Sequence, residues 1–272
     1  MAEIKLELQQ MAIRAREHVL EMAVQGGCFV GSALSCVDIL ISLYSSFLRI
    51  DSKNLTSLNR DYLLLSKGHA VPALYAVLIE IGVLEKHMLK KNVEEGLGRL
   101  YWHPDRRLPG VEFFSGSLGH GLPLAVGLAL DCKLRGHHNR VVVLVGDGEL
   151  NEGSNWEAML VAKAYKLDNL LIIIDRNRFQ ANNLTEELVP LEPLVDKFSA
   201  FNCTTMQVDG HSFNELVATL NKVPFTKDSP NALIANTIRG KGITEFEDIK
   251  ESWFLNLKPE EARKYKNILL KS

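Results

Sequence analysis

The sequence predicts an α/β fold, a doubly wound and mostly parallel sheet with helices on both faces. Two runs carry this prediction: VVVLV at 141–145 and LLIII at 170–174 are continuously apolar and β-branched, as strands buried on both faces are. A helical pattern at about 153–165 separates them, so the unit has the order and length of a right-handed parallel crossover. Helix and strand patterns also alternate along much of the chain.

The remaining elements follow from the spacing of apolar residues. Segments with helical spacing are 4–24, 36–47, 72–83 and 122–134. Further apolar runs of strand type are 62–66 and 232–238. The stretch after Lys258 is charged and helical, and no internal repeat or low-complexity linker appears. We therefore expect one domain over 1–258 and a peripheral helical tail over 259–272.

Composition excludes several classes of protein. The chain has 272 residues, of which 46% are hydrophobic and 24% charged, and its formal net charge is −2. A disordered chain would be less apolar, and a nucleic-acid-binding protein would usually be basic. No apolar run approaches the ~20 residues of a membrane helix, and the N-terminus lacks a signal-peptide core. We expect a cytoplasmic protein that binds neither nucleic acid nor membrane.

Cysteine and histidine positions add two smaller expectations. The cysteines contain no CxxC pair, so we expect free buried thiols: Cys28, Cys36, Cys132 and Cys203. Four histidines outside any recognisable motif are expected at the surface: His18, His87, His137 and His138.

Polar residues follow both central strands, where ligands bind in open α/β sheets. Asp147 lies in GDGELNEG after the first strand, and Asn177 lies in DRNRF after the second. If the strands are neighbours, these side chains come together, and hard oxygen ligands of this kind suit Mg²⁺. Gly146 and Gly148 would let the backbone approach a diphosphate, with a helix N-terminus behind it. The plainer alternative is a strand-to-helix turn with Asp147 as an N-cap.

Several blocks of the sequence, taken together and in this order, resemble a known family. They are SKGHAVPALYAVL (66–78), HPDRRLPGVEFFSGSLGHGL (103–122), GDGELNEGSNWEA (146–158), KLDNLLIIIDRN (166–177), VDGH (208–211) and RGKG (239–242). Nearly the whole chain resembles the thiamine-diphosphate-binding half of transketolase, in the form split into two subunits. The resemblance implies the thiamine-diphosphate-binding fold, as a PP-type domain.

The same resemblance implies roles for individual residues. Asp147, Asn177 and the carbonyl of Phe179 would hold Mg²⁺, or Ca²⁺ or Mn²⁺, against the diphosphate. The implied cofactor-binding set is His69, Gly116, Leu118, Gly146, Asp147, Gly148, Glu149, Asn177 and Phe179. The implied catalytic set is His69, near the reacting carbon, His103, which would reach the substrate, and Glu152. Glu152 and Glu157 match acidic residues at the family's subunit interface.

The resemblance also implies a reaction and a partner. A transketolase moves a two-carbon ketol unit from a ketose or ketose phosphate to an aldehyde. The glutamate that activates the cofactor belongs to a pyrimidine-binding domain, which follows this one in full-length relatives. We therefore expect the partner to be a C-terminal pyrimidine-binding subunit, and the assembly to be an α2β2 heterotetramer with two cofactors at its interfaces.

Three aromatic residues depart from the family pattern. Phe29 and Phe254 stand where histidines are usual, and Trp102 stands where glycine is common. Phenylalanine cannot donate a hydrogen bond to a substrate hydroxyl. These departures favour an alternative in which a 2-oxo acid donates an acyl unit. A non-catalytic, partner-binding subunit is a further alternative, which the intact Asp147 and Asn177 disfavour. A nicotinamide-binding protein is disfavoured because no G-x-G-x-x-G follows an early strand.

Overall fold

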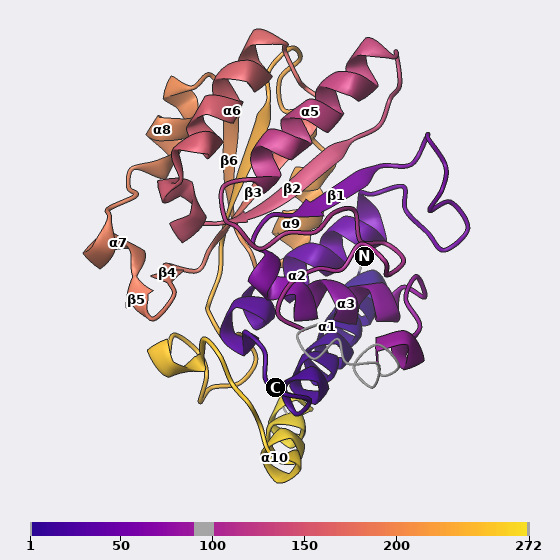
Figure 1. The fold of residues 1–272 in the computed structure, drawn as a ribbon, viewed down its shortest axis with the longest axis vertical. Coiled ribbons are helices and arrows are strands. Elements are labelled where there is room, and N and C mark those ends of the chain that lie inside the picture. Colours follow the sequence, from indigo (N-terminus) through magenta and orange to yellow (C-terminus); the bar gives the residue numbers. More distant parts are fainter. Residues whose placement is uncertain (1, 90–100, 271–272) are drawn as a thin grey trace.

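The computed structural model describes residues 2–89 and 101–270 (Figure 1). Its main sheet has five parallel strands in the order β1-β2-β3-β7-β6. Their bounds are β1 (Tyr62–Leu65), β2 (Val141–Gly146), β3 (Leu170–Arg176), β7 (Asn231–Asn236) and β6 (Thr204–Asp209). A two-stranded antiparallel hairpin, β4 (Phe179–Gln180) and β5 (Asn183–Leu184), follows β3.

Helices surround the sheet. They are α1 (Ala2–Ala23), α2 (Val30–Ser46), α3 (Val71–Glu80), α5 (Gly121–Leu134), α6 (Gly153–Ala164), α7 (Thr185–Leu188), α8 (Leu194–Ala200), α9 (Phe213–Leu220) and α10 (Pro259–Leu269). Short 3-10 turns are η1 (Gly68–Ala70), η2 (Gly148–Asn151) and η3 (Lys250–Ser252).

Alternate residues of the central strands pack into two separate cores. Val142 and Leu144 of β2 join a core built with α1, α2, α3 and α9. Val143 and Val145 face the other way, into a core built with α5, α6 and α8. Figure 1 shows these two helical layers on opposite sides of the sheet. The doubly wound α/β class is therefore confirmed, because helices bury both faces of the sheet.

The spacing of apolar residues did not predict four parts of the fold: strand β6, helix α8, helix α9 and the β4–β5 hairpin. Strand β6 is the edge strand beside β7, and most of its residues are only partly buried. Its sequence, TTMQVD, lacks the continuous apolar character of β2 and β3. An edge strand is hydrogen-bonded to a neighbour on one side only and stays partly exposed to solvent. Its sequence can therefore remain polar, and the apolar pattern that predicts a buried strand is missing.

Helix α10 docks against the body of the molecule. The side chains of Ala262 and Leu269 are buried, and Leu269 belongs to the core on the α1 side. The ring of Tyr265 lies 4.5 Å from that of Phe246, and Lys266 Nζ lies 2.6 Å from Glu21 Oε1. The division at residue 258 stays a prediction, and residues 271 and 272 lie outside the described residues.

The structure also tests the expectations for the cysteines and for membrane-spanning helices. The four cysteines are buried free thiols, as predicted. Within residues 2–89 and 101–270, no helix is long and apolar enough to cross a membrane.

Candidate active site

The carboxyl ends of four adjacent strands meet at one edge of the sheet. The register pairs Leu65 with Leu144, Gly146 with Asp175, and Asp175 with Ala235. The loops that leave these strands therefore start side by side. This arrangement confirms that the strands before Asp147 and Asn177 are neighbours, as the metal-site hypothesis required.

Asp147 is buried at this edge and accepts three hydrogen bonds. Its Oδ1 accepts from the backbone N–H of Gly148 at 2.8 Å. Its Oδ2 accepts from the N–H of Arg178 at 2.6 Å and from Arg176 Nη1 at 3.0 Å. Burial raises the pKa of Asp147 to about 6, although Arg176 acts to lower it. Asp147 is also the N-cap of η2, so the N-cap alternative is part of its role.

The oxygens at this edge fit a hard cation. A carboxylate has about four acceptor positions, of which Asp147 uses three, so one remains for a metal. The side-chain oxygen of Asn177 accepts from the N–H of Phe179 at 3.0 Å and keeps a further lone pair. Helix α6 begins only at Gly153, beyond the short η2 turn. The helix N-terminus expected directly behind the diphosphate is therefore a 3-10 turn, which corrects that detail.

Arg176 is a neighbour of Asp147 that sequence reasoning missed. Its guanidinium bonds to Asp147, to the hydroxyl of Thr185 at 2.6 Å, and to the carboxylates of Glu186 and Glu192 at 2.8 and 3.0 Å. Its charge is therefore fully compensated. The partners after β3 come from a loop and α7, which local periodicity did not predict.

A second buried ion pair lies beneath the edge. Lys67, which follows β1, bonds to Asp175 of β3, and both side chains are almost completely buried. Asp175 also accepts from the hydroxyls of Ser35 and Thr237. Lys67 and its neighbours keep the pKa of Asp175 low against the effect of burial. This network joins α2 to the ends of β1, β3 and β7, and it makes the edge rigid.

Arg239 differs from these pairs because two of its nitrogens are unpaired. Its side chain follows β7, the residue is 1% exposed, and its guanidinium lies 4.8 Å from the ring centroid of Phe179. Nη1 donates to the carbonyl of Ala181 at 2.5 Å, whereas Nε and Nη2 have no partner. Burial lowers the pKa of Arg239 to about 10, an effect that nearby Asp147 opposes. Buried, unpaired donors of a cation, within the electrostatic reach of a carboxylate, fit an anion that brings its own metal.

His69 and His103 are brought together with the 115–118 loop. A Cβ at Gly116 would lie 2.9 Å from the ring of His103, so this glycine admits the histidine. His103 is exposed, whereas His69 is partly buried in η1. Burial, together with the charge of Lys67, lowers the pKa of His69 to about 3. His69 is therefore neutral near pH 7.

An aromatic cluster borders His69 and is defined by Phe29, Trp102, Trp253 and Phe254. The ring of Phe29 lies 5.7 Å from His69, 5.1 Å from Trp253 and 5.3 Å from Phe254. Trp102 lies 5.4 Å from Phe254, and its Nε1 donates to the carbonyl of Gly27. Paired backbone bonds between Cys28 and Leu255 hold the two segments together. The two phenylalanines that depart from the family pattern therefore meet beside a candidate catalytic histidine.

The two glutamates of GDGELNEG lie in different environments. Glu149 is buried, and its carboxylate accepts from the hydroxyl of Ser66 and from the backbone of Gly119 and Gly146. Burial raises its pKa. Its oxygens thus hold together the loops that follow β1 and β2 and the loop before α5. A direct contact between Glu149 and the cofactor stays a prediction. Glu152 is exposed before α6, as is Glu157 within that helix.

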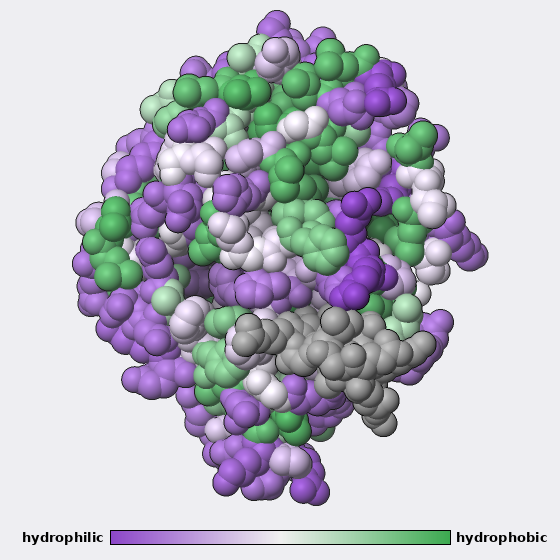
Figure 2. All heavy atoms as spheres, viewed as in Figure 1, coloured by the Kyte–Doolittle hydropathy of each residue, from purple (hydrophilic) through white to green (hydrophobic). Residues whose placement is uncertain are grey.

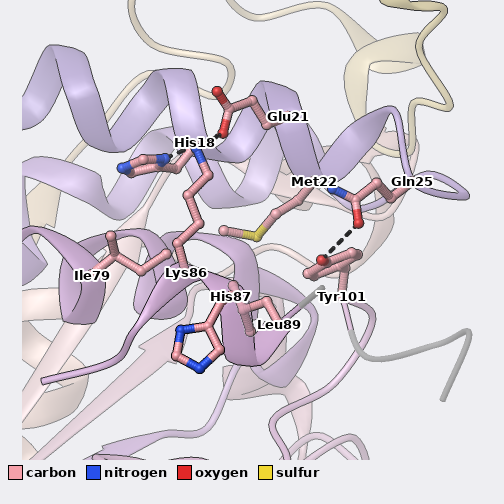
Figure 3. Close-up of a pocket in the computed structure, with 9 residues that line it drawn as sticks. All are labelled: His18, Glu21, Met22, Gln25, Ile79, Lys86, His87, Leu89 and Tyr101. Atoms are coloured by element: carbon pink, nitrogen blue, oxygen red, sulfur yellow. Dashed lines mark hydrogen bonds and ion pairs between the residues drawn. The ribbon is translucent and has the colours of Figure 1, made fainter. Parts of the chain in front are cut away.

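A separate cavity lies between α1, α3 and the segment that carries Lys86, His87 and Leu89 (Figure 3). Its polar groups bond to one another: His18 lies 3.1 Å from Glu80 and 3.4 Å from Glu21, and Tyr101 donates to Gln25. His18 is thus partly buried, and its expected place at the surface was wrong, because acidic side chains from α1 and α3 hold it.

Comparison with known proteins identifies the family. The family described as "Transketolase, thiamine diphosphate binding domain" matches residues 12–270. The chain belongs to the transketolase family. One of its relatives, a subunit of the "Apulose-4-phosphate transketolase" of Actinobacillus succinogenes, is 41% identical over 244 residues, covering 89% of this chain and 88% of the relative. The "6-deoxy-6-sulfo-D-fructose transketolase subunit SqwG" from Clostridium sp. is 38% identical, with the same coverage.

Solved transketolases share the fold. The transketolase from Leishmania mexicana superposes with a TM-score of 0.87 at 25% identity, over 96% of this chain and 41% of that one. The transketolase from Campylobacter jejuni gives 0.80 at 27% identity, over 97% and 43%. The chain thus spans about two fifths of these solved transketolases and most of the relatives named as subunits. A transketolase-like transferase subunit, as predicted, is confirmed at the level of the family.

Proposed function

We propose that this chain is the cofactor-binding subunit of a two-subunit transketolase that moves a two-carbon ketol unit from a ketose to an aldehyde. Thiamine diphosphate and Mg²⁺ would lie at the carboxyl edge of the sheet. One observation carries the proposal: the buried guanidinium of Arg239, which follows β7 at this edge and feels the charge of Asp147, has two unpaired nitrogens. A diphosphate would bond to the guanidinium, and its metal would bond to the carboxylate.

Different residues around this edge would bind the metal and the thiamine diphosphate. Asp147, Asn177 and the carbonyl of Phe179 would hold the metal, for which Ca²⁺ or Mn²⁺ could substitute. The backbones of Gly146 and Gly148 and of the loop at Gly116 and Leu118 would border the cofactor. A Cβ at Gly148 would lie 2.7 Å from the side chain of Gln180, so the turn is tightly packed. Bound thiamine diphosphate supplies the nucleophilic carbon and the electron sink that the protein lacks.

The two histidines would serve the substrate. His69 is neutral near pH 7, so its ring can donate one hydrogen bond and accept another beside the reacting carbon. His103 is exposed over Gly116, where its ring can reach the ketose donor or the aldehyde acceptor. Both would orient hydroxyl groups and move protons, while the packed edge below them holds the cofactor still.

The substrate class follows from the relatives' names. Apulose 4-phosphate and 6-deoxy-6-sulfofructose are both ketoses that end in an anionic group, a phosphate or a sulfonate. We propose a donor of this kind for the present chain. These two compounds, with xylulose 5-phosphate, are the first donors to test.

A partner chain would complete the site. Exposed apolar side chains gather on α5 and α6, as the green area over these helices in Figure 2 shows, and they include Leu124, Leu134, Leu160 and Val161. Glu152 and Glu157 border this surface. Apolar patches rimmed by charge are typical of subunit interfaces. We propose that a pyrimidine-binding subunit docks here and supplies the activating glutamate within a cytoplasmic α2β2 heterotetramer.

The test is an assay of the complex with its partner. The chain is co-expressed with a pyrimidine-binding subunit from the same genome, and the complex is loaded with thiamine diphosphate and Mg²⁺. We expect a ketose carrying a terminal phosphate or sulfonate to donate a glycolaldehyde unit to an aldose phosphate, with the shortened aldehyde or ketone as coproduct. A complex that binds the cofactor but transfers no ketol unit from any of the three donors would refute the proposed reaction.

The aromatic cluster favours one second candidate, acyl transfer from a 2-oxo acid. Phe29 and Phe254 meet beside His69, and neither can donate a hydrogen bond to a hydroxyl. A site that lacks such donors loses its selectivity for the hydroxylated substrate. The transferred unit would then be an acetyl group rather than a glycolaldehyde unit.

Two donors that differ by one hydroxyl separate these candidates. Hydroxypyruvate donates a ketol unit and pyruvate an acetyl unit, and each loses its carboxylate as CO2. If acyl transfer is the native reaction, pyruvate has the higher kcat/KM, and Phe29→His with Phe254→His shifts the ratio toward hydroxypyruvate by about tenfold or more. Phe201→His, a change in an aromatic residue packed on Trp156, is the control. No turnover of pyruvate by the wild-type complex would exclude the acyl reaction.

A further inference from the structure

Asp38 is the centre of a buried cluster that the proposed reaction does not use. It lies on α2, is 4% exposed, and binds Arg16 of α1 through both carboxylate oxygens, at 3.0 and 2.7 Å. His211, in the VDGH block after β6, places its Nδ1 2.7 Å from Asp38 Oδ2. Burial alone would raise the pKa of Asp38, but Arg16 and His211 lower it to about 2. The carboxylate is therefore ionised and fully paired.

The outer ends of this cluster hold one loop from two sides. The backbone N–H of Ile238 donates to His211 Nε2 at 2.8 Å, so the proton of the ring lies on Nδ1 and points to Asp38. Arg16 Nε donates to the carbonyl of Lys241 at 2.9 Å. His211 thus links Asp38 to Ile238, the residue before Arg239. Arg16 links Asp38 to Lys241, the second residue after Arg239.

The loop between these two anchors carries Arg239 and has little freedom. The N–H of Gly240 donates to the carbonyl of Gly31 at 3.0 Å, and the N–H of Asp248 donates to the carbonyl of Arg239 at 2.9 Å. Gly240 has a φ of +76°, where a side chain would be strained and would strike Phe246. A Cβ at Gly31 would lie 2.9 Å from Arg239 Nε, so α2 leaves room for the guanidinium.

We propose that Asp38, Arg16 and His211 form a positioning clamp that holds the 238–241 loop so that Arg239 points its unpaired guanidinium nitrogens at the diphosphate of the cofactor. The clamp acts through Arg239 and does not itself touch the cofactor. This inference rests on the proposed function, since it requires a diphosphate at the strand edge. It gives a role to the VDGH and RGKG blocks, which lie 28 residues apart in the sequence (239 − 211 = 28).

Cofactor affinity in variant complexes tests the clamp. Asp38→Asn keeps the shape of the side chain but removes its charge. We expect the dissociation constant for thiamine diphosphate, measured calorimetrically with saturating Mg²⁺, to rise about tenfold, while kcat at saturating cofactor changes little. Asp61→Asn is the matched control, because it weakens the Arg49–Asp61 ion pair before β1, at the opposite end of the strands, and should leave this constant unchanged.

A double-mutant cycle separates positioning from a general loss of stability. If Asp38 acts through Arg239, Asp38→Asn weakens cofactor binding in the wild type but has no further effect in Arg239→Gln. Hydrogen exchange of the 238–242 backbone should also speed up in Asp38→Asn, while exchange in β2 and β3 stays the same. Additive effects on affinity, or unchanged exchange in the loop, would overturn the clamp.

His211 provides a milder pair of variants should Asp38→Asn fail to fold. His211→Gln keeps an acceptor near Ile238, whereas His211→Asn keeps a donor near Asp38, and each breaks one link of the chain. Both should weaken cofactor binding, and normal affinity in both would refute the clamp. A wild-type complex that binds no thiamine diphosphate would overturn the proposed function together with the clamp. Normal wild-type binding with normal variants would overturn the clamp alone.

Discussion

At the scale of single residues, the strand edge holds two kinds of buried charge. Lys67 with Asp175, and Arg176 with its carboxylates, are paired and bonded, so they stiffen the edge without needing a ligand. Arg239 is buried without a counter-ion on two of its nitrogens. A buried charge without a partner is costly, and it is retained where a ligand supplies the partner. The contrast between these arginines marks where the cofactor is expected.

Removing the Asp147 carboxylate should abolish Mg²⁺-dependent cofactor binding and leave the fold intact. Arg176 keeps Glu186 and Glu192 as partners in Asp147→Ala, so we expect a loss of stability of no more than about 2 kcal/mol. Calorimetry with thiamine diphosphate and Mg²⁺ should show affinity at least about a hundredfold weaker. Glu192→Gln, which changes another partner of Arg176, is the control. Wild-type affinity in Asp147→Ala would refute the ligand assignment.

His69 should make stability depend on pH below neutrality. Its pKa is about 3 in the folded protein, against about 6.5 for a free histidine. Between these values the unfolded chain takes up a proton that the native ring does not. The free energy of unfolding therefore falls as pH falls from about 6.5, by up to about 1.4 kcal/mol per pH unit from this residue. Above pH 7 the effect disappears.

Urea unfolding at pH 7.5 and 5.5 measures this contribution. His69→Gln should lose less stability than the wild type over that interval, because glutamine takes up no proton. His87→Gln removes an exposed histidine and serves as the control. Equal pH dependence in His69→Gln and wild type would contradict a native His69 that stays neutral.

At the scale of elements, helices α2 and α10 differ in how much of their surface is buried against the rest of the molecule. Helix α2 is buried along nearly its whole length, so Gly31, Ser35 and Asp38 all reach the site or its supports. Helix α10 is mostly exposed and touches the core through few side chains. Ala262, Tyr265 and Leu269 recur at helical spacing, so α10 packs on the core through one narrow face.

Two adjacent leucines test the docking of α10. Leu269 is 1% exposed and Leu270 is 65% exposed. Leu269→Ala should lower the free energy of unfolding by ~3 kcal/mol, because it leaves a cavity in the core, whereas Leu270→Ala should change it by less than ~0.5 kcal/mol. Chemical denaturation of both variants gives the values. Similar values for the two would mean that 259–269 is a dispensable tail.

At the scale of the whole molecule, the described chain carries part of the proposed cofactor site. The strand edge holds the residues proposed for the metal and for the diphosphate, and the glutamate that would activate the cofactor is expected from the partner. Exposed apolar side chains lie on α5 and α6, and the exposed Glu157 also lies on α6, which follows the exposed Glu152. Catalysis is therefore expected to require association, and cofactor affinity should depend on the concentration of the partner.

A charge placed on this surface should prevent assembly without unfolding the chain. Leu160 is 60% exposed on α6. Leu160→Glu should retain the wild-type melting temperature of the isolated chain within a few degrees and weaken the complex by at least about tenfold, as measured by size-exclusion chromatography with light scattering. Leu270→Glu, a similar change on α10, should leave assembly intact. Normal assembly of Leu160→Glu would place the interface elsewhere.

The sequence by itself determined the central strands and placed the loops that carry Asp147 and Asn177 after neighbouring strands. Buried parallel strands are continuously apolar, and consecutive strands joined by a helix lie in one sheet, so the residues that follow them meet at one edge. The same reasoning did not predict edge strand β6, whose polar sequence carries little signal of burial.

Only the tertiary structure decided which residues far apart in the chain come together. Phe29 meets Phe254, Asp38 meets His211, and Arg176 meets Asp147 across different loops. Local periodicity reports whether a segment is buried, but it does not report which side chains from other segments bury it. Whether a buried arginine is paired, as Arg176 is, or unpaired, as Arg239 is, depends on those distant neighbours, and that difference carries the proposed function.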